Sequence, residues 1–170
     1  MADLTTISTA KGVAVTAVAE IDEGRRKGLK SRFPKANLYA DWREMLDKEA
    51  ENIDCVNVST PDHLHAAMVM SSMQLGKHVY GQKPLTHDIY ECRQVQDYAR
   101  ENKIVTQMGI QIHSSIQYRS AVHIVQTVVI GKIKEVHTWS SKKWGDMNSK
   151  PDRKDPVPSS INWEHWIGPA

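Results

Sequence analysis

Apolar and polar positions alternate along the first two thirds of the chain in a way that predicts strands and helices in turn. Short apolar runs predict strands at residues 13–19, 37–40, 54–59, 78–81 and 104–108. Between these runs, apolar positions three or four residues apart predict helices near residues 22–32, 41–50, 61–75 and 86–99. Such alternation at short spacing favours an α/β fold in which a parallel sheet has helices on both faces.

Capping residues support several of these helix starts. Asp22 and Asp41 each stand directly before a helical pattern, where a short carboxylate accepts a backbone N–H of the first turn. Thr60 followed by Pro61 predicts another start, because proline is favoured in a first helical turn. Thr86 is the expected cap of the fourth helix.

The pattern changes near residues 109–115, which we take as a boundary between domains. Residues 116–129 predict a long amphipathic helix that Gly131 ends. Residues 133–139 are strand-like, and residues 150–160 are proline-rich and polar, as in a loop. The part after the boundary therefore differs in organisation from the part before it.

Composition narrows the range of partners. The 170 residues carry a net charge of only +2, and basic residues are scattered, so we expect no nucleic-acid partner. No apolar run approaches a membrane span, and no signal segment opens the sequence, so we expect no membrane and a cytoplasmic location. Cys55 and Cys92 fall in apolar patterns, which predicts two reduced, buried thiols.

Lys83 is the first candidate for chemistry. It ends the predicted strand at 78–81 and precedes Pro84, which places an ammonium group at the carboxyl end of a parallel strand, where open α/β sheets bind ligands. A lysine there can exchange a proton with a substrate hydroxyl while hydride moves to or from a nicotinamide. An ordinary surface lysine before a turn proline fits the same residues, and the local sequence leaves both interpretations open.

The acids Glu20 and Asp22 follow the first predicted strand. A carboxylate at such a position can accept the ribose hydroxyls of NAD and repel the phosphate of NADP. Because Asp22 is already the expected helix cap, Glu20 is the better candidate for the ribose.

A metal site at Asp62, His63 and His65 is the hypothesis that we reject. The three lie in a predicted first helical turn, where positions two apart diverge, whereas metal ligands must converge. We expect no metal, and we expect the preceding loop to line a cofactor groove instead.

Taken together, these segments resemble the Gfo/Idh/MocA family of NAD(P)-dependent oxidoreductases. Gln82 stands where the family's Glu-Lys-Pro signature has glutamate, as in a branch with Gln-Lys-Pro. The resemblance rests on five stretches, at residues 53–65, 76–84, 108–111, 130–133 and 163–170.

The resemblance implies a partial Rossmann-like dinucleotide-binding domain at residues 1–112 and the start of a second α+β domain at 113–170. It implies hydride transfer with NAD or NADP, a sugar, cyclitol or related polyol as substrate, and Lys83 as the catalytic residue. It also implies a set of residues that border the cofactor: Glu20, Asp22, Ser59, Thr60, Pro61, His65, Gln82, Gln111 and Trp166.

The sequence departs from the family pattern at its start, since the family's first strand and glycine-rich phosphate loop are not in it. That strand is central in the family's sheet, so residues 13–19 and 54–59 should face a gap with unpaired backbone groups. We expect these two strands to pair directly, or another copy to donate a strand. The edge at 133–139 should also seek a partner, so we expect a homo-oligomer.

Loss of the phosphate loop leaves a second hypothesis open. The chain could be a non-catalytic binding or assembly module that keeps the scaffold. A hydrolase is a third hypothesis, but the sequence shows no nucleophile–base pair for it.

Overall fold

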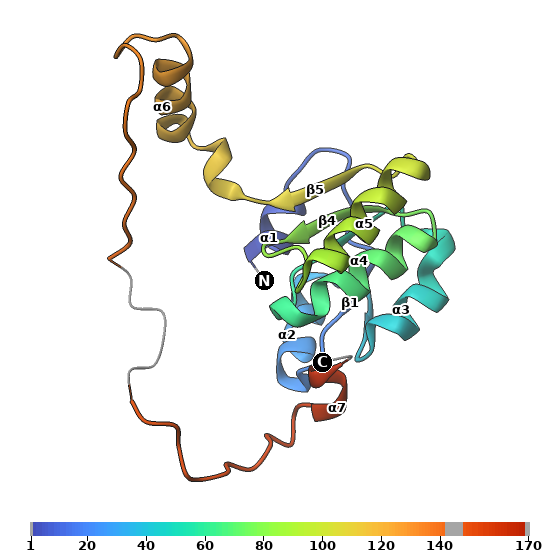
Figure 1. Cartoon of the computed structure of the whole chain (residues 1–170). Coiled ribbons are helices and arrows are strands. Elements are labelled where there is room, and N and C mark those ends of the chain that lie inside the picture. Colours follow the sequence, from blue (N-terminus) through green and yellow to red (C-terminus); the bar gives the residue numbers. More distant parts are fainter. Residues whose placement is uncertain (1, 142–147, 169–170) are drawn as a thin grey trace. The chain divides into compact units, whose positions relative to one another are not determined.

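The computed structural model describes residues 2–141 and 148–168 (Figure 1). The chain forms two compact units, one of Met1–Gly109 with Val157–Ala170 and the other of Ile110–Pro156. The larger unit thus receives a segment from the end of the chain. The division into domains at residue 112 stays a prediction.

The larger unit contains five parallel strands in two sheets. They are β1 (Ala17–Ala19), β2 (Asn37–Tyr39), β3 (Cys55–Val58), β4 (His78–Gln82) and β5 (Thr106–Gly109). The first sheet has the order β1-β2, and the second has the order β3-β4-β5. The predicted α/β class with parallel strands is confirmed.

Helices connect these strands, as parallel neighbours require (Figure 1). The helices of this unit are α1 (Ala2–Ile7), α2 (Glu23–Arg32), α3 (Trp42–Glu49), α4 (His65–Gln74), α5 (Ile89–Glu101) and α7 (Trp163–Ile167). Two short 3-10 turns, Ala50–Asn52 and Asp62–Leu64, precede β3 and α4.

The core of this unit lies where α4 packs against β3 and β4. Val69 and Met73 of α4 are each 1% exposed, and they belong to one buried cluster with Val58 and Val79. Full burial of such a side chain contributes about 1.5–3 kcal/mol. This packing fixes the ends of β3 and β4, where most of the predicted site residues lie.

Two of the predicted helix caps are confirmed. The Asp22 side chain accepts the Arg25 N–H at 3.1 Å, and Asp41 accepts the Arg43 N–H at 2.9 Å. Each carboxylate satisfies a donor that the first helical turn leaves without a partner.

The other two predicted caps are wrong. The Thr60 hydroxyl faces the Met68 sulfur at 3.5 Å, because the chain first makes a 3-10 turn and α4 begins only at His65. Asp88 caps α5 in place of Thr86, by accepting the Glu91 N–H at 2.9 Å in a capping box. The carboxylate stands directly before the helix, whereas the threonine is two residues too early.

The expected direct pairing of β1 with β3 is also wrong. Within the described residues, β1 pairs with β2 alone, where the Glu20 N–H donates to the Tyr39 carbonyl at 3.0 Å, and β3 pairs with β4 alone. Because β1 spans three residues, closing the gap would gain only a few ladder hydrogen bonds of about 0.5–1.5 kcal/mol each. That gain would have to offset moving α3, which packs on β1 and β2. Donation of a strand by another copy stays a prediction.

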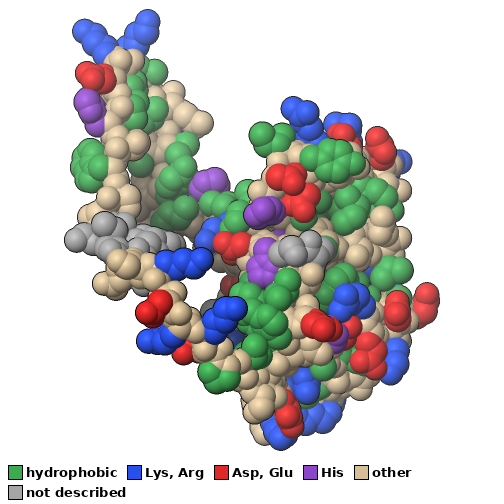
Figure 2. Space-filling view, turned by 60° about the horizontal axis from the view of Figure 1, so that its bottom comes forward, with side chains coloured by type: hydrophobic (Ala, Val, Ile, Leu, Met, Phe, Trp, Pro, Cys, Tyr) green, Lys and Arg blue, Asp and Glu red, His purple; other side chains and the backbone are tan. Residues whose placement is uncertain are grey.

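The smaller unit contains the 3-10 turn Gln111–Ser114 and the helix α6 (Ile116–Gln126). α6 ends three residues earlier than predicted, since Val128 and Gly131 take positive φ values of 58° and 80°. The predicted strand at 133–139 is extended chain without a ladder partner in the described residues. Apolar side chains therefore remain at the surface of this unit (Figure 2).

Cys55 and Cys92 are free thiols, but both are exposed, so the prediction of their burial is wrong. Cys55 is on the outward face of an edge strand, where the alternation of a strand places every second side chain away from the core. Within residues 2–141 and 148–168, no helix combines the length and the apolar character needed to cross a membrane.

Candidate functional site

Ser59 and Gln82 come together at the carboxyl ends of β3 and β4. A single carboxylate oxygen of Asp3, in α1, accepts the Ser59 hydroxyl at 2.7 Å and the Gln82 side-chain amide at 2.6 Å. Parallel strands end at one edge of a sheet, which explains how the two predicted residues meet. Sequence reasoning missed Asp3, which lies 56 and 79 residues from its two partners.

Two hydrogen bonds and one close backbone approach position the Gln82 side chain. Its side-chain oxygen accepts the Lys83 backbone N–H at 3.2 Å, while its amide nitrogen donates to Asp3. Gly109 at the end of β5 leaves room for it, since a Cβ there would approach the Gln82 side chain to 2.8 Å. The side chain therefore has a defined position beside the catalytic candidate.

Lys83 itself follows directly after β4, and its side chain is exposed. It begins a turn in which the Lys83–Pro84 peptide bond is cis. An ammonium group thus stands at the rim of the sheet, at the end of a strand fixed by the core.

His65 is buried, with 1% of its surface exposed. Its Nδ1 lies 2.6 Å from the Pro84 carbonyl oxygen, and its Nε2 lies 2.8 Å from the Thr60 carbonyl oxygen. The imidazole therefore connects the loop after β3 to the turn that carries Lys83. Both ring nitrogens are engaged, so any influence on a cofactor acts through the loop that His65 holds.

The acids Glu20 and Asp22 lie at the end of β1. One Glu20 carboxylate oxygen accepts the Asp22 backbone N–H at 3.0 Å. Asp22 caps α2, and the Arg25 backbone N–H is the main reason that the pKa of Asp22 is lowered. Its second oxygen lies 3.4 Å from the Ser160 hydroxyl. Both carboxylate oxygens of Asp22 therefore accept hydrogen bonds from within the chain, and so does one carboxylate oxygen of Glu20.

The end of the chain returns to this edge through α7. His63 Nε2 lies 2.7 Å from the Trp166 carbonyl oxygen, and the two rings meet edge to face at 5.2 Å. Trp163 stacks on Trp166, with ring centroids 4.9 Å apart. Contacts across about a hundred residues of sequence thus bring Trp166 to the loop after β3.

A second set of contacts fixes the same segment beside β1. The Glu23 backbone N–H donates to the Ser160 carbonyl at 3.1 Å. His165 Nε2 lies 3.7 Å from an Asp41 carboxylate oxygen. Burial raises the pKa of Asp41, but hydrogen bonds from Arg43 outweigh that effect, and the pKa is lowered overall.

The remaining predicted residues divide between the two units. Ser59 and Pro61 are exposed at the edge of the larger unit, and Thr60 is half-buried. Gln111 opens the first turn of the smaller unit and is exposed, and its place near the nicotinamide stays a prediction. Among the predicted residues of the larger unit, Ser59, Gln82 and Lys83 lie at the ends of β3 and β4, whereas Glu20 and Asp22 follow β1 of the other sheet.

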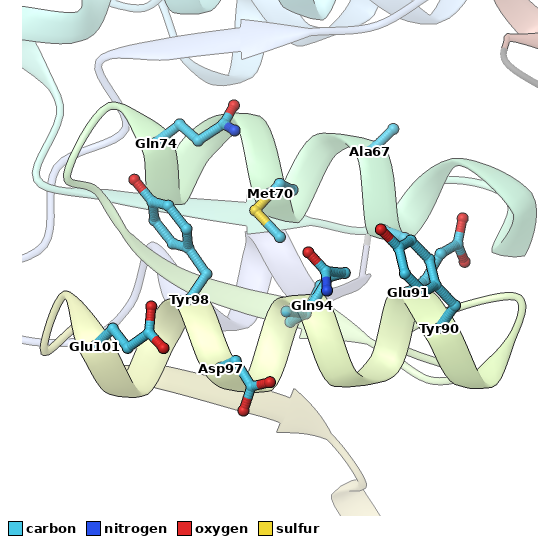
Figure 3. Close-up of a pocket in the computed structure, with 11 residues that line it drawn as sticks. Ala67, Met70, Gln74, Tyr90, Glu91, Gln94, Asp97, Tyr98 and Glu101 are labelled. Atoms are coloured by element: carbon cyan, nitrogen blue, oxygen red, sulfur yellow. The ribbon is translucent and has the colours of Figure 1, made fainter.

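A cavity of about 630 Å³ lies elsewhere, between α4 and α5 (Figure 3). The rings of Tyr90 and Tyr98 extend from α5 toward α4, with Met70 between them. No predicted site residue lines it in the part of the chain that the structure describes. The ends of β3 and β4 remain the candidate site, because Lys83 follows β4 there and the Ser59 hydroxyl and the Gln82 amide meet at the Asp3 carboxylate.

Open parallel α/β sheets, including those of dinucleotide-binding proteins, bind their ligands at the carboxyl ends of the strands. The chain belongs to the Gfo/Idh/MocA family, described as an oxidoreductase family with an NAD-binding Rossmann fold, whose sequence model matches residues 3–110. The match covers most of the larger unit and confirms the resemblance.

Individual relatives are consistent with this family. Over 119 residues, 69% of this chain, it is 28% identical to a levoglucosan dehydrogenase of Pseudarthrobacter phenanthrenivorans, of which it covers 30%. Over 112 residues, 64% of this chain, it is 30% identical to an alpha-N-acetylgalactosaminidase of Shewanella oneidensis, of which it covers 23%.

Among solved structures, the myo-inositol 2-dehydrogenase of Lactobacillus plantarum is similar, with a TM-score of 0.68 and 26% identity. That alignment covers 75% of this chain and 37% of the other. The chain thus spans less than half the length of each of these relatives.

Proposed function

We propose that this chain supplies the cofactor-side part of an NAD(P)-dependent oxidoreductase acting on a sugar, cyclitol or related polyol, with Lys83 as the catalytic residue. The observation that supports this most directly is the position of Lys83 at the end of β4, next to Gln82 and Ser59. Ligands of open parallel sheets bind at that edge. The similarity to a levoglucosan dehydrogenase and a myo-inositol 2-dehydrogenase supports a polyol or sugar substrate.

The hydrogen-bonding groups at the strand ends fit two parts of a dinucleotide. Glu20 would accept ribose hydroxyls through the carboxylate oxygen that does not accept the Asp22 N–H. Gln82 and Ser59 would offer an amide and a hydroxyl near the nicotinamide end. A bound NAD or NADP would accept or donate the hydride. Nothing in residues 2–141 and 148–168 forms a glycine-rich cradle for the pyrophosphate.

In the proposed oxidation, a CH–OH group of the polyol loses a hydride and a proton and becomes a carbonyl. Lys83 is the group that exchanges this proton with the substrate hydroxyl, in one direction during oxidation and in the other during the reverse reaction. Gln82 accepts the Lys83 backbone N–H and so orients the turn. His65 holds the same turn through the Pro84 carbonyl.

Cofactor binding tests this proposal. We expect NADH or NADPH to bind below about 1 mM when titrated by fluorescence, and Glu20→Ala to weaken binding by about tenfold, the effect of one lost charge-assisted hydrogen bond. Glu51→Ala, an exposed acid outside the site, is the matched control and should leave binding unchanged. Absence of binding at millimolar dinucleotide would contradict the proposal.

A second candidate function is a non-catalytic binding or assembly module. The contact of Asp3 with both Ser59 and Gln82 favours it, because that carboxylate takes up the two groups proposed for the nicotinamide end. Turnover assays with myo-inositol and levoglucosan distinguish the two, with Lys83→Ala expected to abolish turnover but not cofactor binding. An α-N-acetylgalactosaminide belongs in the same panel, since one relative is named for its hydrolysis.

A further inference from the structure

The cavity between α4 and α5, here called the α4–α5 groove, has an acidic and aromatic lining. Its volume of about 630 Å³ is within the range of about 300–1,000 Å³ that is usual for small-molecule sites. Three carboxylates line it, those of Glu91, Asp97 and Glu101, and no lysine or arginine lines it in the part of the chain that the structure describes. Tyr90 and Tyr98 add two aromatic rings. The groove is therefore complementary in charge to a cation.

The rings and carboxylates gather at the two ends of the groove (Figure 3). Tyr98 and Glu101, which are neighbours on the surface of α5, lie at one end. Tyr90 and Glu91 lie at the other end. The two tyrosines are eight positions apart on α5, which corresponds to about 12 Å along a helix. Each end thus offers a ring and a carboxylate, and both of these attract an organic ammonium group.

The two glutamates keep their charge available for a ligand, whereas Asp97 does not. Asp97 pairs with Arg100 at 2.8 Å. Glu91 Oε2 accepts the His87 backbone N–H at 2.7 Å, which leaves its negative charge without a cation. None of the ion pairs within residues 2–141 and 148–168 involves Glu91 or Glu101. One uncompensated carboxylate therefore remains at each end of the groove.

The middle of the groove is mainly apolar. Met70 lies between the two tyrosine rings (Figure 3), and Ala67 and Val95 also belong to the lining. A ligand that matches the groove has ammonium groups at its ends and methylene groups between them. The terminal nitrogens of spermidine are nine single bonds apart, or about 11 Å when the chain is extended at about 1.2 Å per bond. That length is close to the separation of the two tyrosines.

We propose that the α4–α5 groove binds a linear aliphatic polyamine of about the length of spermidine, with one terminal ammonium group beside Glu91 and the other beside Glu101. This site shares no residue with the proposed cofactor site. Tyr90 is 72% exposed, so water weakens the attraction. We expect a dissociation constant of about 0.1–1 mM at low ionic strength, and weaker binding as added salt screens the charges.

Calorimetric titration with amines of different length and charge tests the match. Octamethylenediamine has the same nine-bond span as spermidine and should bind in the same range. Putrescine has the same two charges as octamethylenediamine but spans only about 6 Å, so it should bind at least about fivefold more weakly. Octylamine keeps the chain but has one ammonium group, and it should also bind at least about fivefold more weakly. Equal affinities of the two diamines, or no saturable spermidine binding below about 5 mM, would overturn the proposal.

Substitution of Tyr90 tests the aromatic contact at a position where folding is not at risk, because the side chain is largely exposed. Tyr90→Ala should raise the dissociation constant of spermidine about three- to tenfold. Tyr90→Phe should keep it within about twofold, because the face of the ring and not the hydroxyl attracts the cation. Tyr118→Ala, at an exposed tyrosine of the smaller unit, is the matched control. Equal effects of Tyr90→Ala and Tyr118→Ala would contradict the site.

A charge substitution separates a specific site from general attraction to an acidic surface. Glu101→Gln keeps the size of the side chain and should weaken spermidine binding at least about threefold. Glu51→Gln removes the same charge at an exposed position outside the groove and should leave binding unchanged. Equal weakening by the two variants would refute specific binding. A lysine-rich peptide that binds more tightly than spermidine, and is weakened by the same Tyr90→Ala change, would replace the polyamine with a basic protein segment.

Discussion

The two units of the chain differ in where their apolar side chains lie. In the larger unit, Val69 and Met73 are almost fully buried between α4 and the sheet. In the smaller unit, α6 has no buried residue, and Val129 is 73% exposed. Since burial of apolar surface is the main favourable contribution to folding, the larger unit is the part that can fix a site. The smaller unit leaves its apolar side chains exposed.

The largest expected loss of stability comes from a substitution in the core of the larger unit. Met73→Ala should lower the free energy of unfolding by about 2–5 kcal/mol, because it leaves a cavity among packed side chains. Val129→Ala in the smaller unit should change it by less than about 0.5 kcal/mol. Urea denaturation followed by circular dichroism measures both. Similar losses in the two variants would remove the contrast between the units.

A smaller loss of stability is expected from a substitution of His65, the buried residue beside the candidate site. His65→Ala leaves the Thr60 and Pro84 carbonyl oxygens without their imidazole partner, which should cost about 1–3 kcal/mol. It should also speed hydrogen exchange in the turn after β4. His123→Ala, at an exposed position of α6, serves as the control. Unchanged exchange near Lys83 would show that the imidazole does not hold this turn.

The smallest expected effect is a dependence on pH. The pKa of Asp41 is lowered in the folded chain from the ordinary value of 3.8, so its contribution to stability is present above that value. The contribution is lost as the pH falls through the lowered pKa. Asp41→Asn keeps a helix cap but removes the ionisable group, so its stability should fall less steeply below about pH 4. Asp152→Asn, at an exposed position of the smaller unit, is the matched control.

Local rules predicted much of the larger unit. Asp22 and Asp41 were identified as caps because capping depends on a few adjacent residues. Thr60 and Thr86 were misassigned because a 3-10 turn and a competing carboxylate shift the helix starts by a few residues. The proximity of Ser59 and Gln82 followed from parallel topology, which carries strand ends to one edge.

Long-range contacts were beyond the reach of such rules. Neither spacing nor periodicity relates Asp3 to residues 56 and 79 positions away. The strand patterns at 13–19 and 54–59 also did not show that, in the described residues, β1 and β3 belong to separate sheets. The strand-like pattern at 133–139 predicts a preference, but a strand forms only beside another strand.

The imidazole of His65 makes the two halves of the candidate site thermodynamically dependent on each other. It spans the carbonyl oxygens of Thr60 and Pro84, so a ligand that displaces one loop alters the hydrogen bond that restrains the other. By reciprocity, a ligand at the loop after β3 and a ligand at the turn that carries Lys83 would change each other's affinity by the same factor. A ligand bound at the loop that contains Thr60 would then also change the position of the turn that carries Lys83.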